Sequence, residues 1–145
     1  METRLKINEQ DPEGYTALVA FDKYLKSTSI SPIQKELIKI RASQINGCSF
    51  CIDSHTTDAR KMGESERRIY SISTWRDTPF FTEEERAILA LTEEITLISQ
   101  RVSDKTFNNA VNILGEKYVA QVIMAIIIIN SWNRLAISTN IEPVI

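Results

Sequence analysis

Apolar residues recur every three to four positions along most of the chain, which is the spacing of one buried helical face. The pattern is clearest in residues 82–99, TEEERAILALTEEITLIS, where acidic residues fill the first turn. Thr82 and Glu85 have the spacing of a capping box, in which each side chain accepts a hydrogen bond from the other residue's backbone amide. The apolar stripe of this segment consists of Ile88, Leu89, Leu91 and Ile95. We therefore predict an amphipathic helix that begins at Thr82.

Polar caps, prolines and glycines predict where other helices begin and end. In SPIQKELIKIRASQING, residues 31–47, Ser31 is the expected N-cap, Pro32 occupies the first helical position, and Gly47 ends the helix. Four glycines and four prolines in the whole chain are few, and this favours an all-α architecture. The remaining expected helices are 11–26, capped by Asp11; about 48–62, ended by Gly63; 65–73; and 103–115, capped by Ser103 and ended by Gly115.

The last apolar segment, EKYVAQVIMAIIIINSWNRLAIS, is locally ambiguous. Its VIMAIIII run is rich in β-branched residues and resembles a buried strand. A single strand in a helical chain has no partner to pair with, so we predict a buried helix. We expect one all-α domain, residues 1–145, of about six to seven helices. The segment from Val119 to Ile129, with Trp132 and Leu135, carries more apolar surface than a small core needs, so we also expect contact with another subunit.

Composition narrows the classes of partner. Seventeen Lys and Arg against nineteen Asp and Glu give a formal charge of -2, so the sequence shows no basic footprint for nucleic acid or an anionic membrane. The first ten residues lack a signal-peptide pattern, and no apolar run is expected to reach the length of a membrane span. We expect a cytoplasmic protein. In a reducing compartment, two closely spaced cysteines indicate redox chemistry or metal binding more than a structural disulfide.

Both cysteines and the only histidine lie within eight positions, in QINGCSFCIDSHTTDARKMG, residues 44–63. Cys48 is expected at a helix N-terminus, with Cys51 three residues later and His55 four beyond that, so the three side chains share one helical face. The partial positive charge of a helix N-terminus lowers the pKa of a nearby thiol, and an imidazole one turn away can accept its proton. The C-x-x-C pair can close a disulfide once one sulfur is oxidised.

Other interpretations of this cluster compete with redox catalysis. Two helical cysteines are often small buried apolar residues. Zinc is a second alternative, but Cys48, Cys51 and His55 supply three ligands and a structural site needs four, so a carboxylate would have to complete it. Haem attachment requires the histidine directly after the second cysteine, and a thioredoxin-like site would follow a strand in a βαβ unit. We expect neither a bound metal nor a cofactor.

The run KELIKIRASQINGCSFCIDSHTTDARKMGESERRI resembles the core of the alkylhydroperoxidase D family, within the carboxymuconolactone decarboxylase-like superfamily. The shared pattern is E-x(11)-C-x-x-C-x-x-x-H, formed here by Glu36, Cys48, Cys51 and His55. The C-terminal INSWNRLAIS also resembles a segment common in these proteins. The resemblance implies an all-α fold and a CxxC-dependent peroxidase that assembles as trimers or as hexamers built from dimers. Some members have a second histidine between the cysteines, where this chain has Ser49 and Phe50.

Glu36 is expected to face the cysteines from the preceding helix, which packs antiparallel to the cysteine helix through a turn at Asn46 and Gly47. Near an apolar core its pKa would be raised, so that it could exchange protons near neutral pH. The remaining conspicuous residues are interpreted as structural. Trp132 would be a core or interface anchor, Arg134 would pair with a carboxylate, and Asp53 and Asp58 would be exposed charges.

We therefore predict a thiol-dependent hydroperoxidase or disulfide reductase. Cys51 would attack the peroxide, His55 and Glu36 would move the proton, and Cys48 would resolve the sulfenic acid into a Cys48–Cys51 disulfide. The assignment of the cysteines rests on the imidazole, because the helix terminus alone favours Cys48 as nucleophile. The expected partners are a hydroperoxide substrate, a dithiol reductant and further copies of the chain in a dimer, trimer or hexamer. The alternatives are a non-enzymatic redox-sensing or interaction module and, less favoured, a decarboxylase of the lactone branch, which lacks the cysteine pair.

Overall fold

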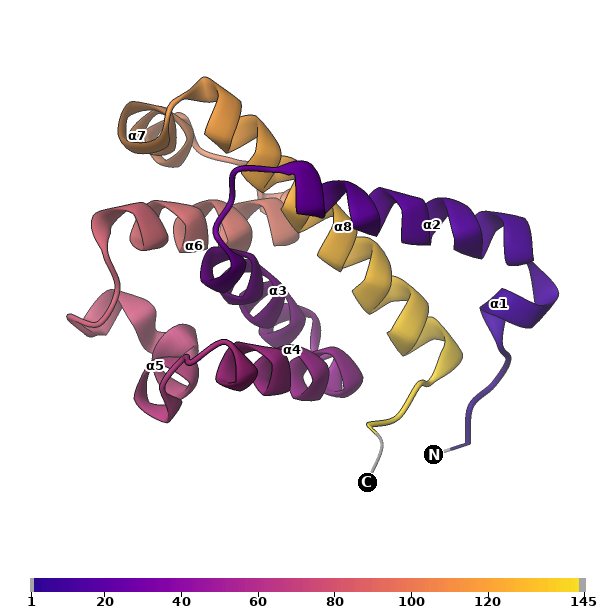
Figure 1. Cartoon of the computed structure of the whole chain (residues 1–145). Coiled ribbons are helices and arrows are strands. Elements are labelled where there is room, and N and C mark those ends of the chain that lie inside the picture. Colours follow the sequence, from indigo (N-terminus) through magenta and orange to yellow (C-terminus); the bar gives the residue numbers. More distant parts are fainter. Residues whose placement is uncertain (1, 144–145) are drawn as a thin grey trace.

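The computed structural model of the chain describes residues 2–143 and shows the predicted all-helical single domain (Figure 1). Eight α-helices lie within these residues, close to the number expected. Their bounds are α1 Ile7–Gln10, α2 Pro12–Tyr24, α3 Pro32–Asn46, α4 Ser49–Lys61, α5 Glu66–Ser71, α6 Glu83–Thr96, α7 Asp104–Leu114 and α8 Glu116–Thr139. Short 3-10 helices, η1 Leu25–Ser27, η2 Ile72–Asp77 and η3 Ile98–Gln100, follow α2, α5 and α6.

The predicted caps begin the helices as expected. Ser31 and Thr82 each form a complete capping box, with Gln34 and Glu85 respectively. Asp11 accepts a hydrogen bond from the Gly14 amide at 3.1 Å. These caps satisfy amides that no residue inside the helix can reach, which explains why the helix starts could be identified locally.

Helix α3 is the centre of the fold and packs against α4, α6 and α8 (Figure 1). The largest core cluster joins α3, α6 and α8, and its fully buried members include Ile38, Ile88, Leu91, Ile126 and Ile128. A second cluster lies between α3, η2 and α6, around Leu37, Ile40, Ile72, Trp75 and Leu89. The β-branched VIMAIIII run is part of α8, so the helical interpretation is confirmed.

A buried polar network also connects α3 to α8. The Asn46 side-chain amide donates to the side-chain oxygens of Asn130 and Asn133, at 3.0 and 2.9 Å. Asn133 is fully buried and donates in turn to the Ser43 hydroxyl at 2.9 Å. These directional bonds fix the end of α3, and the turn that follows it, against one position along α8.

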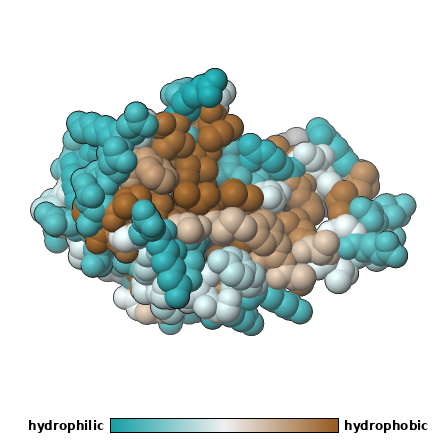
Figure 2. Space-filling model, turned by 90° about the horizontal axis from the view of Figure 1, so that it is seen from above, coloured by the Kyte–Doolittle hydropathy of each residue, from teal (hydrophilic) through white to brown (hydrophobic). Residues whose placement is uncertain are grey.

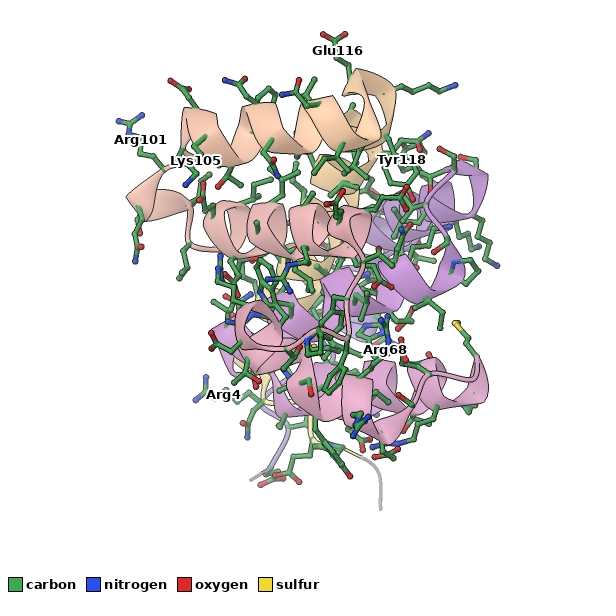
Figure 3. The ribbon with its side chains drawn as sticks, turned by 90° about the vertical axis from the view of Figure 1, so that its left-hand side faces the viewer. Arg4, Arg68, Arg101, Lys105, Glu116 and Tyr118 are labelled. Atoms are coloured by element: carbon green, nitrogen blue, oxygen red, sulfur yellow. A yellow bond between two sulfur atoms is a disulfide. The ribbon has the colours of Figure 1, made fainter. Side chains whose placement is uncertain are left out.

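Two polar residues in Figure 3 illustrate how the remaining elements are held. Tyr118, in the first turn of α8, donates a hydrogen bond to the Gln34 side-chain oxygen on α3. Arg68 on α5 forms ion pairs with Glu64 at 2.9 Å and with Glu85 on α6 at 2.6 Å. Both carboxylates therefore satisfy the Arg68 guanidinium, which is not free to bind an anion.

In the described part of the chain, Arg134 Nη1 donates to the backbone and side-chain oxygens of Asn130, both at 3.0 Å. The expected pairing of Arg134 with a carboxylate stays a prediction. The expectation that no apolar run is long enough to span a membrane is wrong by length and composition, because α8 meets both criteria, although 44% of that apolar stretch is buried in the fold. The core helix of a globular domain meets the same criterion, and the packing of α8 on α3 and α6 accounts for the buried part of its apolar sequence.

Candidate active site

The turn between α3 and α4 places both cysteines at the start of α4. Gly47 ends α3 in the left-handed conformation, φ 70° and ψ 33°, which glycine adopts without steric cost. Cys48 then caps α4, and its sulfur accepts a hydrogen bond from the Cys51 amide at 3.4 Å. The two sulfurs form a disulfide, with the Cα atoms 5.3 Å apart. The C-x-x-C spacing therefore brings the two thiols together as expected.

Glu36, on α3, lies next to His55 and is almost fully buried, with 4% of its surface exposed. Its Oε2 is 2.9 Å from His55 Nδ1, and its Oε1 accepts a hydrogen bond from Lys39 Nζ at 3.1 Å. A carboxylate that accepts the Nδ1–H of an imidazole leaves Nε2 as the basic nitrogen. Glu36 thus fixes the ring of His55 and selects the tautomer that can accept a proton on the opposite side.

The expected rise in the pKa of Glu36 is wrong. Burial raises the pKa of this carboxyl, but the hydrogen bond to His55 and the charge of Lys39 outweigh it, so that the pKa lies below its ordinary value of 4.5. Glu36 is therefore an anion at neutral pH. It orients and polarises His55 and does not itself exchange protons in that range.

A cavity of about 370 Å³ adjoins this pair, and Cys51 and His55 both line it. Cys48 is not among its lining residues. Its apolar walls come from α2, α4, α8 and the segment after α8: Tyr15, Phe50, Ile128, Ile129, Trp132, Leu135, Ala136 and Ile141. The polar groups on its surface are Asp22, Lys39, Ser54, His55 and Asp58. Such a cavity suits a small organic molecule with one reactive polar end.

Trp132 has a larger part in this cavity than the sequence suggested. Its ring packs edge-to-face on Tyr15, with centroids 5.8 Å apart, and its indole N–H donates to Asp22 at 3.3 Å. Tyr15 and Asp22 belong to α2, so these contacts hold α2 over the cavity. Trp132 therefore joins the wall of the site to the helix that covers it.

A metal ion is a weaker explanation of the same residues. Within the described chain, Glu36, His55 and Asp58 are grouped with their ligand atoms within 4.8 Å of one another. Both oxygens of Glu36, however, already accept hydrogen bonds from Lys39 and His55, and the ammonium group of Lys39 supplies the positive charge that this carboxylate needs. The zinc alternative further requires Cys48, Cys51 and His55 to face one point, but Cys48 does not line the cavity that Cys51 and His55 share.

The structure brings together all four residues proposed for catalysis, with Cys51 and His55 on α4, Cys48 as the N-cap of α4, and Glu36 on α3. Sequence reasoning missed Lys39, although its position three residues after Glu36 on one helix is a detectable signal. It also missed the aromatic walls of the cavity, because Tyr15 and Trp132 are far apart in the chain. Asp58 is only partly exposed and lines the cavity, whereas Asp53 is exposed as expected.

Comparison with known proteins agrees with this arrangement. Residues 12–94 match the carboxymuconolactone decarboxylase family. The chain is 46% identical over 139 residues to the uncharacterised protein YdfG of Bacillus subtilis, and the match covers 95% of each chain. No activity is attached to this relative.

Solved structures agree in fold. ATU0492 from Agrobacterium tumefaciens, a protein of unknown function, superposes with a TM-score of 0.96 at 34% identity and covers 99% of each chain. An AhpD-core, peroxidase-related protein from Ralstonia eutropha superposes with a TM-score of 0.80 at 18% identity, over 94% of this chain and 74% of that one. The second likeness shows the fold alone.

The buried carboxylate gives a prediction about stability and pH. Because its pKa is lowered in the folded state, Glu36 stabilises the fold fully above its ordinary pKa of 4.5, and this contribution is lost as the pH falls through the lowered value. At pH 7, Glu36→Gln should reduce the free energy of unfolding by about 1.5–3 kcal/mol, the range for hydrogen bonds to charged groups. Urea unfolding at neutral pH and in acid measures the difference, which should shrink in acid.

Glu9→Gln is the matched control, because Glu9 pairs with Lys6 at the same three-residue spacing but is exposed. Its effect should stay within about 1 kcal/mol. Equal effects of the two substitutions at neutral pH would contradict the stabilising role of Glu36.

Proposed function

The chain belongs to the carboxymuconolactone decarboxylase family and has the AhpD-like fold, and from this premise we propose that it is a thiol-dependent hydroperoxidase. The observation that carries the proposal is the presence of Cys51 and His55 in the wall of one cavity, with Glu36 bonded to the far side of the imidazole. This is the arrangement of a nucleophile, a base and a group that orients the base. The provisional name of ATU0492, an antioxidant defence protein AhpD, supports the same function.

Cys51 is the sulfur that meets the hydroperoxide. It faces the cavity one helical turn before His55, whereas the amide hydrogen bond at the N-terminus of α4 goes to the sulfur of Cys48. The assignment of Cys51 therefore rests on the imidazole. His55 Nε2 accepts the thiol proton, and the Glu36 carboxylate stabilises the imidazolium that results. A second histidine between the cysteines is therefore not required for a complete proton relay.

The oxidation consumes one hydroperoxide and two thiols. The Cys51 thiolate attacks the terminal peroxide oxygen, the S–O bond forms as the O–O bond breaks, and the departing alkoxide takes the proton from His55. Cys48 then attacks the sulfur of the Cys51 sulfenic acid and expels water, which leaves the disulfide seen in the structure. The products are an alcohol, water and one disulfide, and a dithiol reductant must restore the two thiols.

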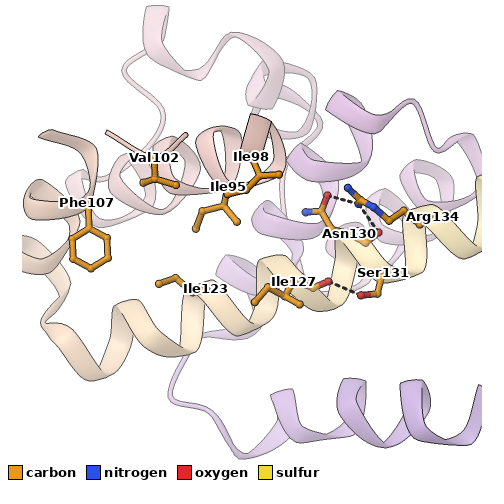
Figure 4. A pocket seen from close by; sticks show the side chains of 9 residues that line it. All are labelled: Ile95, Ile98, Val102, Phe107, Ile123, Ile127, Asn130, Ser131 and Arg134. Atoms are coloured by element: carbon orange, nitrogen blue, oxygen red, sulfur yellow. Dashed lines mark hydrogen bonds between the residues drawn. The ribbon is translucent and has the colours of Figure 1, made fainter. Parts of the chain in front are cut away.

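We also propose a homo-oligomer, because α8 leaves apolar surface exposed. Figure 2 shows hydrophobic side chains gathered in a continuous area bordered by hydrophilic ones. An open pocket of about 600 Å³, distinct from the cavity at Cys51, lies between the C-terminal end of α6, the N-terminal half of α7 and one side of α8 (Figure 4). Its apolar residues are Ile95, Ile98, Val102, Phe107, Ile123 and Ile127. Ile98, Phe107 and Ile127 are each more than 40% exposed, and a second copy of the chain would cover them.

Turnover separates an enzyme from a redox switch. With excess dithiothreitol, the protein should consume many equivalents of cumene hydroperoxide, and His55→Ala should slow consumption by about 100- to 10,000-fold. Both rates are measured by peroxide loss, with circular dichroism to verify that the variant is folded. A single equivalent consumed by the wild type, followed by no turnover, would make the protein a switch.

The exposed isoleucine on α8 tests the assembly. Ile127→Glu should shift the protein to smaller species and leave it folded, because a charge would enter a subunit interface at a position that is 42% exposed in the single chain. Ile113→Glu is the control, since Ile113 is 36% exposed but lies outside the pocket. Light scattering measures the masses. A wild-type protein that is monomeric at micromolar concentration contradicts the assembly.

A further inference from the structure

The two sulfurs of the disulfide lie in different openings. Cys51 lines the cavity of about 370 Å³, whereas Cys48 lines a smaller pocket of about 200 Å³ where the α3–α4 turn meets the end of α8. Ala136 and Ile141 line both openings and so form the wall between them. A molecule in one opening therefore meets only one of the two sulfurs.

The pocket at Cys48 opens directly to the surface. The residues on either side of Cys48, Gly47 and Ser49, are exposed, and the space around the Gly47 α-carbon is open. Ile137, on the last turns of α8, is 46% exposed beside them. Cys48 itself is only 2% exposed, so a reagent reaches its sulfur by inserting a narrow group into the pocket.

We propose that the reducing dithiol attacks Cys48 through this pocket, whereas the hydroperoxide reacts with Cys51 in the cavity. The two substrates of the cycle would then approach opposite ends of the same disulfide. This assignment rests on the proposed function. It adds the place where the reductant docks and the sulfur that forms the mixed disulfide.

The chemistry of thiol–disulfide exchange also favours attack of the reductant on Cys48. A thiolate attacks a disulfide sulfur in line with the S–S bond, and the electron pair of the broken bond leaves on the other sulfur. Attack on Cys48 makes Cys51 the leaving group, and Cys51 shares its cavity with His55, whose imidazolium form stabilises a thiolate. Attack on Cys51 would instead release Cys48, which does not line the cavity that contains His55.

The cycle then closes with balanced electrons. The first exchange joins the reductant's sulfur to Cys48 and leaves Cys51 as a thiolate. The second thiol of the reductant attacks its own sulfur in this mixed disulfide, forms the oxidised reductant and releases Cys48 as a thiolate that takes up a proton. The reductant must therefore be a dithiol whose first sulfur protrudes far enough to enter a pocket of about 200 Å³.

Glutathione, which has a single thiol, is the probe that stops the reaction at the mixed disulfide. The protein is first oxidised with diamide, then treated briefly with glutathione, quenched in acid and alkylated with N-ethylmaleimide. Peptide mass spectrometry should find glutathione on Cys48 and N-ethylmaleimide on Cys51. Glutathione on Cys51 overturns the proposal. Diamide forms the disulfide without peroxide, so the result does not depend on whether the protein is a hydroperoxidase.

Two bulky substitutions, one in each opening, test which opening the reductant and the hydroperoxide use. Ile137→Trp fills the pocket at Cys48, and it should slow reduction of the disulfide by glutathione by about 10- to 200-fold without changing oxidation of the dithiol by cumene hydroperoxide. Ser54→Trp narrows the cavity at Cys51, and it should have the opposite effect. Slower reduction in Ser54→Trp together with unchanged reduction in Ile137→Trp would show that the reductant enters through the cavity.

Discussion

The hydrogen bond between the buried Glu36 carboxylate and His55 is the interaction on which the site depends. A buried carboxylate is costly unless it is paired, and here each oxygen has one partner, His55 or Lys39. The bond crosses from α3 to α4, so it fixes the orientation of the helix that contains both cysteines. It also leaves the proton-accepting nitrogen of the imidazole directed away from Glu36. One contact therefore contributes to the packing of two helices and to the chemistry of the thiol.

The rest of the fold keeps that contact in place. Helix α3 supplies Glu36, and the network of Asn46, Asn130 and Asn133 ties its last turn to α8. Gly47 then lets the chain reverse within one residue, so α4 starts next to the end of α3 with Cys48 as its cap. Because α8 also contributes Trp132 and Ala136 to the cavity, the same network sets the distance between the cavity wall and the cysteines.

The elements that the sequence predicted well depend on local interactions. Ser31 and Thr82 cap their own helices, and Cys48, Cys51 and His55 are close because helical spacing makes them close. The features that it did not predict depend on parts of the chain far apart. Tyr15 and Trp132 meet in the cavity although they come from opposite ends of the sequence. The pKa of Glu36 was predicted in the wrong direction because burial was weighed without the hydrogen bond from His55 and the charge of Lys39. The hydrogen bonds from Arg134 to Asn130, one turn before it on the same helix, were also missed.

We propose that Cys51, and not Cys48, is the sulfur that hydroperoxide oxidises. The direct measurement uses two single-cysteine variants, reduced and then exposed to cumene hydroperoxide in the presence of dimedone, which labels sulfenic acid. We expect rapid labelling of Cys51 in Cys48→Ser and much slower labelling of Cys48 in Cys51→Ser, because Cys51 shares its cavity with His55. Equal or faster labelling of Cys48 would contradict it.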